Sequence, residues 1–137
     1  MTLAILDTSV YLEHFRKGLF KKELQAGDFL IRNSAVVLAE LYRGCRRAEE
    51  REAIEELASN FPILTPTERI WLESGRILSQ LSEKKGYSCE KLRNLHFDVL
   101  IALSARASGA WVLTLDGSDF EEIRKIRAFK LILWSRP

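Results

Sequence analysis

Short apolar segments that alternate with helical patterns constrain the fold of this chain more than any other feature. The first, Leu3–Leu6, is an unbroken apolar run that stops at Asp7. Such a run is typical of a strand covered on both faces, as in a parallel sheet. Further strands are expected at Phe29–Ile31, Phe61–Leu64, Trp111–Leu115 and Lys130–Trp134. The alternation predicts an α/β domain of three layers, with a mostly parallel sheet of about five strands.

Helical signals separate these strands. Ser34 is placed to cap a helix that runs to about Cys45, and Thr65 begins a capping box that is completed by Glu68. Other helices are expected at Val10–Phe15, at Ala48–Ser59, from Leu92 to Gly109 and at Phe120–Ile126. The helix after Thr65 carries an apolar stripe of Ile70, Trp71, Ser74, Ile77, Leu78 and Leu81. We expect this stripe in the core, and an exposed remainder would mark an interaction surface.

Length and composition fit a single domain, residues 1–137, with an ordinary hydrophobic core. Lysine and arginine total 21 and aspartate and glutamate 19, so the formal net charge of +2 does not by itself indicate a nucleic-acid binder. Cys45 and Cys89 lack the spacing of a zinc site or a disulfide framework, which favours the reduced cytoplasm. No apolar run approaches the ~18 residues that span a bilayer, and the N-terminus lacks a signal-peptide pattern.

Four carboxylates differ from the many that lie on solvated helix faces. Asp7 ends the first strand and Asp116 ends the fourth, while Glu40 and Asp98 lie in otherwise apolar helices. An isolated carboxylate in such a place is costly unless it is paired, hydrogen-bonded or bound to a metal. Because the carboxyl ends of parallel strands and the starts of the following helices meet at one edge of a sheet, we expect all four side chains to converge there.

Carboxylates that are crowded together without a lysine or arginine among them repel one another. A divalent cation relieves this repulsion, and ligands that are all oxygen favour Mg²⁺ or Mn²⁺ over zinc. Such a site suits the hydrolysis of phosphate esters, because the ion activates water and stabilises charge on the attacked phosphate.

Each acidic residue also has a simpler explanation. Asp7 could cap the next helix, and Glu40 could pair with Arg43 three residues later. Asp98 would be favoured by the helix dipole, and Asp116 could belong only to a turn. Because all four fall at one predicted edge, we favour a shared metal site over four separate explanations.

Four segments occur together and in a fixed order: Ile5–Val10, Ser34–Leu41 with Gly44, Asp98–Ala105 and Leu113–Phe120. Any one of them is a weak signal, whereas the ordered set is specific and covers essentially the whole chain. At these residues the sequence resembles the PIN-domain family of metal-dependent ribonucleases and, more narrowly, the VapC-type toxins of toxin–antitoxin pairs. The resemblance implies the strand order 3-2-1-4-5, in which strands one and four flank the point where the order reverses.

The resemblance also implies roles for individual residues. Asp7, Glu40 and Asp98 match the family's core metal carboxylates, and Asp116 matches its fourth acidic position. Thr8 and Ser9 match hydroxyl residues that support the first aspartate or a bound water, and Asp119 matches an additional acidic position that some members of the family have. Whether Asp116 or Asp119 reaches the metal stays open. A homodimer, and an antitoxin whose tail covers the active site, are implied as well.

We therefore expect an endoribonuclease that hydrolyses RNA phosphodiester bonds with one or two Mg²⁺ or Mn²⁺ ions, as the toxin of a type II toxin–antitoxin pair. RNA must approach four carboxylates, so nearby cations are needed to hold its phosphates. Arg43 and Arg46 follow Glu40 and are candidates for this role. A second candidate group precedes Asp98 and consists of Lys84, Lys85, Lys91 and Arg93.

Other functions remain open for an α/β domain of this kind. A phosphatase with a strand-end aspartate nucleophile usually has a second aspartate two residues on, where Ser9 stands. A receiver domain needs an acceptor aspartate and a lysine in the neighbourhoods of Thr65 and Ser135. The alternative that keeps the fold is a catalytically idle module that binds RNA or protein.

Overall fold

The computed structural model describes residues 2–17 and 29–134, and its centre is a parallel sheet of five strands. The strands are β1 (Thr2–Leu6), β2 (Phe29–Ser34), β3 (Ile63–Leu64), β4 (Trp111–Thr114) and β5 (Lys130–Leu133). Their order is β3-β2-β1-β4-β5, and every neighbouring pair is parallel, so the expected strand order is confirmed. Ser135, which weighed against a receiver domain, lies outside the described residues. The strand order reverses between β1 and β4, and ligands bind at the carboxyl edge beside such a reversal.

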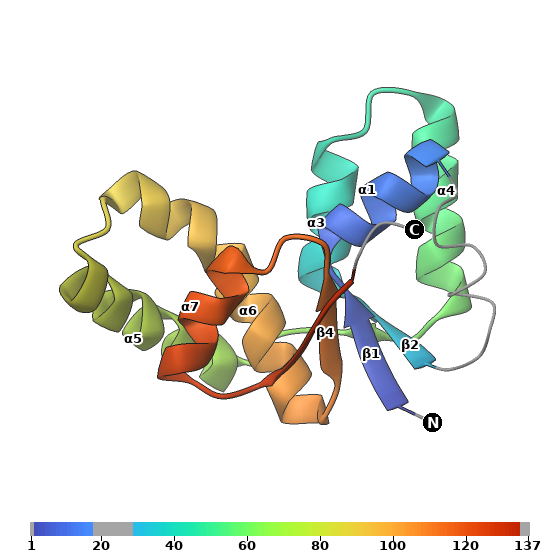
Figure 1. Cartoon of the computed structure of the whole chain (residues 1–137). Coiled ribbons are helices and arrows are strands. Elements are labelled where there is room, and N and C mark those ends of the chain that lie inside the picture. Colours follow the sequence, from blue (N-terminus) through green and yellow to red (C-terminus); the bar gives the residue numbers. More distant parts are fainter. Residues whose placement is uncertain (1, 18–28, 135–137) are drawn as a thin grey trace.

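The helices form two groups, one on each side of the strands (Figure 1). One group consists of α1 (Thr8–Lys17), α3 (Ala35–Arg43) and α4 (Ala48–Asn60), and the other of α5 (Glu68–Lys85), α6 (Cys89–Ser108) and α7 (Ser118–Ile126). In the second group α6 packs on β4, and α5 and α7 pack on α6 and on each other. The predicted three-layer α/β architecture is therefore confirmed. Over residues 2–17 and 29–134, no helix is both long enough and apolar enough to span a bilayer.

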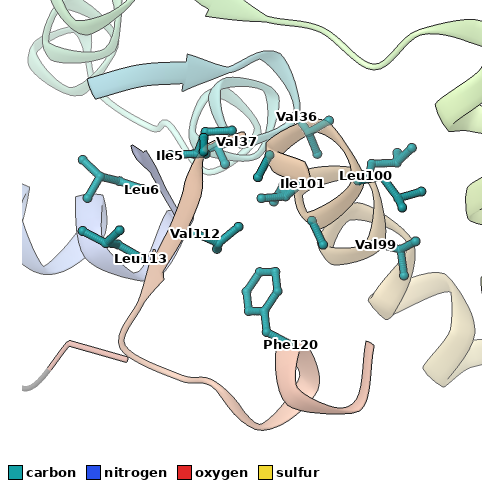
Figure 2. Packing of buried hydrophobic residues seen from close by; sticks show 14 of the residues in the cluster. Ile5, Leu6, Val36, Val37, Val99, Leu100, Ile101, Val112, Leu113 and Phe120 are labelled. Carbon is teal, nitrogen blue, oxygen red and sulfur yellow. The ribbon is translucent and has the colours of Figure 1, made fainter. Parts of the chain in front are cut away.

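The core fills both faces of the two central strands. Figure 2 shows Val112 pointing toward Phe120 and Ile101, and Leu113 pointing to the opposite side, near Leu6. All five side chains are buried. Because side chains alternate along a strand, a strand buried on both faces reads as a continuous apolar run, which is how β1 and β4 appear in the sequence. The packing fixes the carboxyl ends of these two strands, where the candidate site lies.

The helix caps follow local sequence signals, with one difference. The Ser34 hydroxyl accepts a hydrogen bond from the backbone N–H of Val37 at 3.3 Å, so the predicted cap of α3 is confirmed. Thr67, rather than Thr65, caps α5 and accepts a hydrogen bond from the N–H of Ile70 at 3.2 Å. Both threonines can cap, and the one that precedes the first helical residue takes the role.

β2 extends beyond the predicted Phe29–Ile31 because its polar end is buried. The side-chain amide of Asn33 donates hydrogen bonds to the carbonyls of Leu57, at 2.8 Å, and Phe61, at 3.1 Å. These bonds tie the end of α4 to the sheet and satisfy a polar group that would otherwise be costly to bury. The apolar pattern stops before Asn33, so it did not indicate that the strand continues.

The apolar stripe on α5 is only partly in the core. Ile70, Ser74, Ile77 and Leu81 are buried, whereas Trp71 is 47% exposed. The neighbouring Leu72 is 59% exposed, so α5 presents an apolar pair to solvent. Such an exposed pair is the remainder that would mark an interaction surface.

Candidate active site

Asp7 lies directly after β1 and is buried, with 8% of its surface exposed. Its backbone N–H donates to the carbonyl of Leu113 at 2.9 Å and so extends the β1–β4 ladder by one residue. Its carboxylate Oδ2 accepts two hydrogen bonds, from Ser9 Oγ at 3.0 Å and from Thr114 Oγ1 at 2.9 Å. Asp7 is thus held by hydroxyl groups from α1 and β4, an arrangement that differs from a helix cap.

The two hydroxyls are themselves oriented by the backbone. Ser9 Oγ accepts a hydrogen bond from the N–H of Leu115 at 3.2 Å, and Thr114 Oγ1 accepts one from the N–H of Asp116 at 3.2 Å. Each hydroxyl can therefore direct its single hydrogen at Asp7. Sequence reasoning included Ser9 but missed Thr114. The available signal was a hydroxyl residue at the end of the strand that was expected to lie beside β1.

Glu40 lies on α3, half-buried, and faces the start of α1. Thr8 Oγ1 donates a hydrogen bond to its Oε1 at 3.0 Å, so Thr8 contacts Glu40, whereas the resemblance implied support of the first aspartate or of a bound water. Burial raises the pKa of Glu40, and the charge of Asp7 raises it further. The Thr8 hydrogen bond and the charge of Arg43 oppose these effects. Asp7 and Glu40 therefore lie close enough to repel each other.

Asp98 is the most perturbed carboxylate of the site. Its pKa rises from 3.8 to about 8, first because the side chain is withdrawn from solvent and then because Asp7, Glu40 and Asp119 repel its charge. Lys91 opposes this rise. The pKa of Asp98 is thus affected by the charges of three carboxylates that are far apart in the sequence: one directly after β1, one on α3 and one on α7. A helix-dipole explanation of Asp98 predicts the opposite direction of shift.

Asp119 and Asp116 take different positions at the start of α7. Asp119 is half-buried, interacts with Asp98, and accepts a hydrogen bond from Lys91 Nζ at 3.0 Å. Asp116 is exposed, and its Oδ1 accepts hydrogen bonds from the N–H of Ser118 at 3.4 Å and from its hydroxyl at 3.2 Å. The turn explanation accounts for the contacts of Asp116. That Asp116 binds an ion stays a prediction.

The two arginines proposed to hold RNA differ in their relation to the carboxylates. The guanidinium carbon of Arg43 lies 5.7 Å from the centroid of the Phe97 ring, one residue before Asp98, and its charge acts on Glu40. Arg46 is exposed on the connection between α3 and α4, and its backbone N–H donates to Glu50. Arg43 is therefore at the rim of the acidic site, whereas the contacts of Arg46 point to α4.

The donor set fits a hard divalent cation. Asp7, Glu40, Asp98 and Asp119 provide only carboxylate oxygens, which suit Mg²⁺ or Mn²⁺. Within residues 2–17 and 29–134, no three Asp, Glu, His or Cys side chains lie so that they could together hold a metal ion as they stand. The fit instead rests on the chemistry of these carboxylates: burial and the like charges of Asp7, Glu40 and Asp119 raise the pKa of Asp98, and a bound cation would oppose the repulsion.

The sequence profile of the PIN domain matches residues 4–126 of this chain. No curated protein matches the chain in sequence. Three toxin–antitoxin complexes contain chains of similar fold. In VapBC2 from Rickettsia felis, bound to a DNA fragment from its promoter, the similar chain is 22% identical with a TM-score of 0.71, and the match covers 98% of this chain and 100% of that one.

The second is VapBC-1 from nontypeable Haemophilus influenzae, with 22% identity, a TM-score of 0.72, and coverage of 97% of this chain and 98% of that one. The third is DNA-bound VapBC from Salmonella typhimurium, with 20% identity, a TM-score of 0.73, and coverage of 98% and 100%. At these identities the likeness establishes the fold. Since the family profile covers nearly the whole chain, including all four clustered carboxylates, the protein belongs to the PIN domain family.

Proposed function

We propose that this protein is an endoribonuclease that hydrolyses RNA phosphodiester bonds with Mg²⁺ or Mn²⁺. The observation that carries the proposal is the gathering of Asp7, Glu40 and Asp119 around Asp98, whose pKa is raised by burial and by their charges. Acidic side chains are kept in such a costly arrangement where a cation is to be bound. Asp7, Glu40, Asp98 and Asp119 are the residues that would hold the ion.

Each part of the chain has a distinct role in this proposal. A bound divalent ion supplies Lewis acidity, which makes water more acidic and stabilises charge on the phosphate. Ser9 and Thr114 hold the carboxylate of Asp7 in one orientation, and Thr8 does the same for Glu40. Mutation of residues that orient metal ligands in this way typically lowers metal affinity or activity by about 10–100-fold.

RNA binding requires positive charge at the rim, because the site itself repels phosphates. The position of Arg43 over Phe97, beside Glu40, supports this role for it. Arg46 would contact RNA further from the reacting phosphate. Its exposed side chain leaves it accessible to a bound strand.

We further propose that the protein is the toxin of a type II toxin–antitoxin pair, with a cognate antitoxin as partner and a homodimer as its own assembly. Membership of the PIN family and the fold shared with VapBC complexes support this assignment. The exposed Trp71 and Leu72 on α5 offer apolar surface to a protein partner. Cys45 and Cys89 are free thiols, in keeping with a reduced cytoplasm.

A catalytically idle PIN module is the competing proposal, and one experiment separates the two. The purified chain would be incubated with a random-sequence RNA pool and Mg²⁺ or Mn²⁺, and new RNA ends would be sequenced. We expect cleavage that chelator abolishes and that Asp98→Asn reduces by at least about 100-fold. Glu55→Gln, which alters an exposed carboxylate on α4, should cleave like wild type. Cleavage by Asp98→Asn at the wild-type rate would rule out this site.

A further inference from the structure

Lys91 lies within the acidic site, yet the proposed function gives it no role. It is on α6, about two helical turns before Asp98 and on the same face. Its Nζ lies 3.0 Å from Oδ1 of Asp119 on α7, and α6 and α7 pack side by side (Figure 1). The ammonium also lies 5.7 Å from the centroid of the Tyr87 ring. Lys91 is therefore held over the Asp98–Asp119 side of the site.

A contribution to stability does not account for this placement. The side chains of Lys91 and Asp119 are each 39% exposed, and ion pairs at such positions contribute about 0–1 kcal/mol. The charge of Lys91 matters more for the carboxylates that repel one another. It acts on Asp98 in the sense opposite to Asp7, Glu40 and Asp119. Lys91 thus performs locally what a bound cation would do.

Charge balance indicates how many ions the site needs. The four carboxylates carry four negative charges when ionised. Arg43 acts on Glu40 and Lys91 acts on Asp119 and Asp98, so these two side chains offset two of the charges. One divalent ion offsets the other two. A second divalent ion would leave the site with excess positive charge before RNA binds.

We propose that the ammonium group of Lys91 takes the place of a second divalent cation on the Asp98–Asp119 side, so that this site binds one ion. The inference rests on the proposed function, in which the same carboxylates hold the ion. Lys91 is a positioning residue in this account, because it sets the charge around Asp98 and Asp119. Its ammonium stays in the site when RNA is present and adds a positive charge near the phosphate.

The test counts ions rather than cleavage. The whole purified chain would be titrated with Mn²⁺ by calorimetry, with free Mn²⁺ followed by electron paramagnetic resonance. We expect one ion per chain in wild type and in Lys91→Arg, which keeps the charge. Lys91→Met, which keeps the aliphatic stem but removes the charge, should bind two. Lys125→Met removes an exposed lysine from the last turn of α7 and should bind one.

The outcomes separate this inference from the proposed function. Two ions in wild type, or one ion in a folded Lys91→Met protein, would overturn the inference and leave the nuclease proposal intact. A wild-type chain that binds no Mn²⁺ would overturn both. Circular dichroism of each variant checks the fold, and Lys91 is a mild site for substitution because its side chain is partly exposed.

Discussion

At the scale of single residues, the protein holds two carboxylates by opposite means. Asp7 is buried, and its carboxylate accepts two hydrogen bonds, from Ser9 and Thr114. Asp98 is half-buried among like charges, so its pKa rises to about 8. The first arrangement fixes a ligand in place. The second leaves a carboxylate whose repulsion from its neighbours is relieved when a cation binds. Both are expected of carboxylates that share an ion.

The raised pKa of Asp98 predicts how the metal-free protein responds to pH. The folded state holds this proton more tightly than the unfolded chain, whose aspartates titrate near 3.8. The resulting stabilisation is complete below the unfolded pKa and is lost as pH rises to about 8. In chelator, we expect the free energy of unfolding of wild type to fall between about pH 4 and pH 8, by at most about 1.4 kcal/mol per pH unit from this group, and the melting temperature to fall with it.

Asp98→Asn removes this titrating carboxyl group and should flatten the pH dependence of stability. Thermal unfolding followed by circular dichroism measures that dependence directly. Asp116→Asn is the matched control, because Asp116 is exposed and contacts Ser118 rather than the other carboxylates. Its profile should follow wild type. Identical profiles for wild type and Asp98→Asn would show that Asp98 is not the perturbed group.

At the scale of elements, the start of α7 decides which acidic residue joins the site. Asp119 lies in the first turn of α7 and interacts with Lys91 and Asp98, while Asp116 bonds to Ser118 before the helix. We therefore expect Asp119→Asn to lower RNA cleavage by about 10-fold or more and to weaken Mn²⁺ binding. Asp116→Asn keeps an acceptor oxygen for Ser118 and should cleave within about twofold of wild type. Cleavage rates and Mn²⁺ titrations of both variants check this, and the reverse ranking would assign the position to Asp116.

The elements themselves were largely predictable from the sequence. Buried central strands are recognisable because both of their faces are apolar, as in β1 and β4. The end of α6 was predictable because Gly109 adopts a φ of 71°, a left-handed conformation that favours glycine at a helix end. The strand order came from the family resemblance and not from the strand patterns.

Details that depend on contacts between distant segments were not predictable. β2 continues past Ile31 because Asn33 and Ser34 pair with β3 and because the Asn33 amide finds carbonyl partners on α4 and after it. Thr114 reaches Asp7 only because β4 pairs with β1. The sequence likewise could not distinguish Asp116 from Asp119, since both follow the same strand. The convergence of Asp7 and Glu40, by contrast, followed from the parallel topology. Asp98 joins them from the middle of α6 rather than from the expected helix start.

At the scale of the whole molecule, the core opposes the repulsion within the site. Buried side chains on both faces of β1 and β4, together with α6, hold the elements that carry the carboxylates (Figure 2). The site therefore lowers the stability of the metal-free protein, and removing one charge should raise it. Binding sites commonly oppose stability in this way.

Metal binding should reverse the order of stability between wild type and the Asp98→Asn variant. In chelator at about pH 8, Asp98→Asn should melt at the higher temperature, because it lacks one of the repelling charges. An ion that binds only the folded state adds about 2.7 kcal/mol to the free energy of unfolding when its free concentration is about 100 times its Kd. Wild type and Glu55→Gln should gain this increment with Mn²⁺, and Asp98→Asn should gain little. Equal gains in wild type and Asp98→Asn would mean that the ion binds elsewhere, because Asp98 links the carboxylates of β1, α3 and α7.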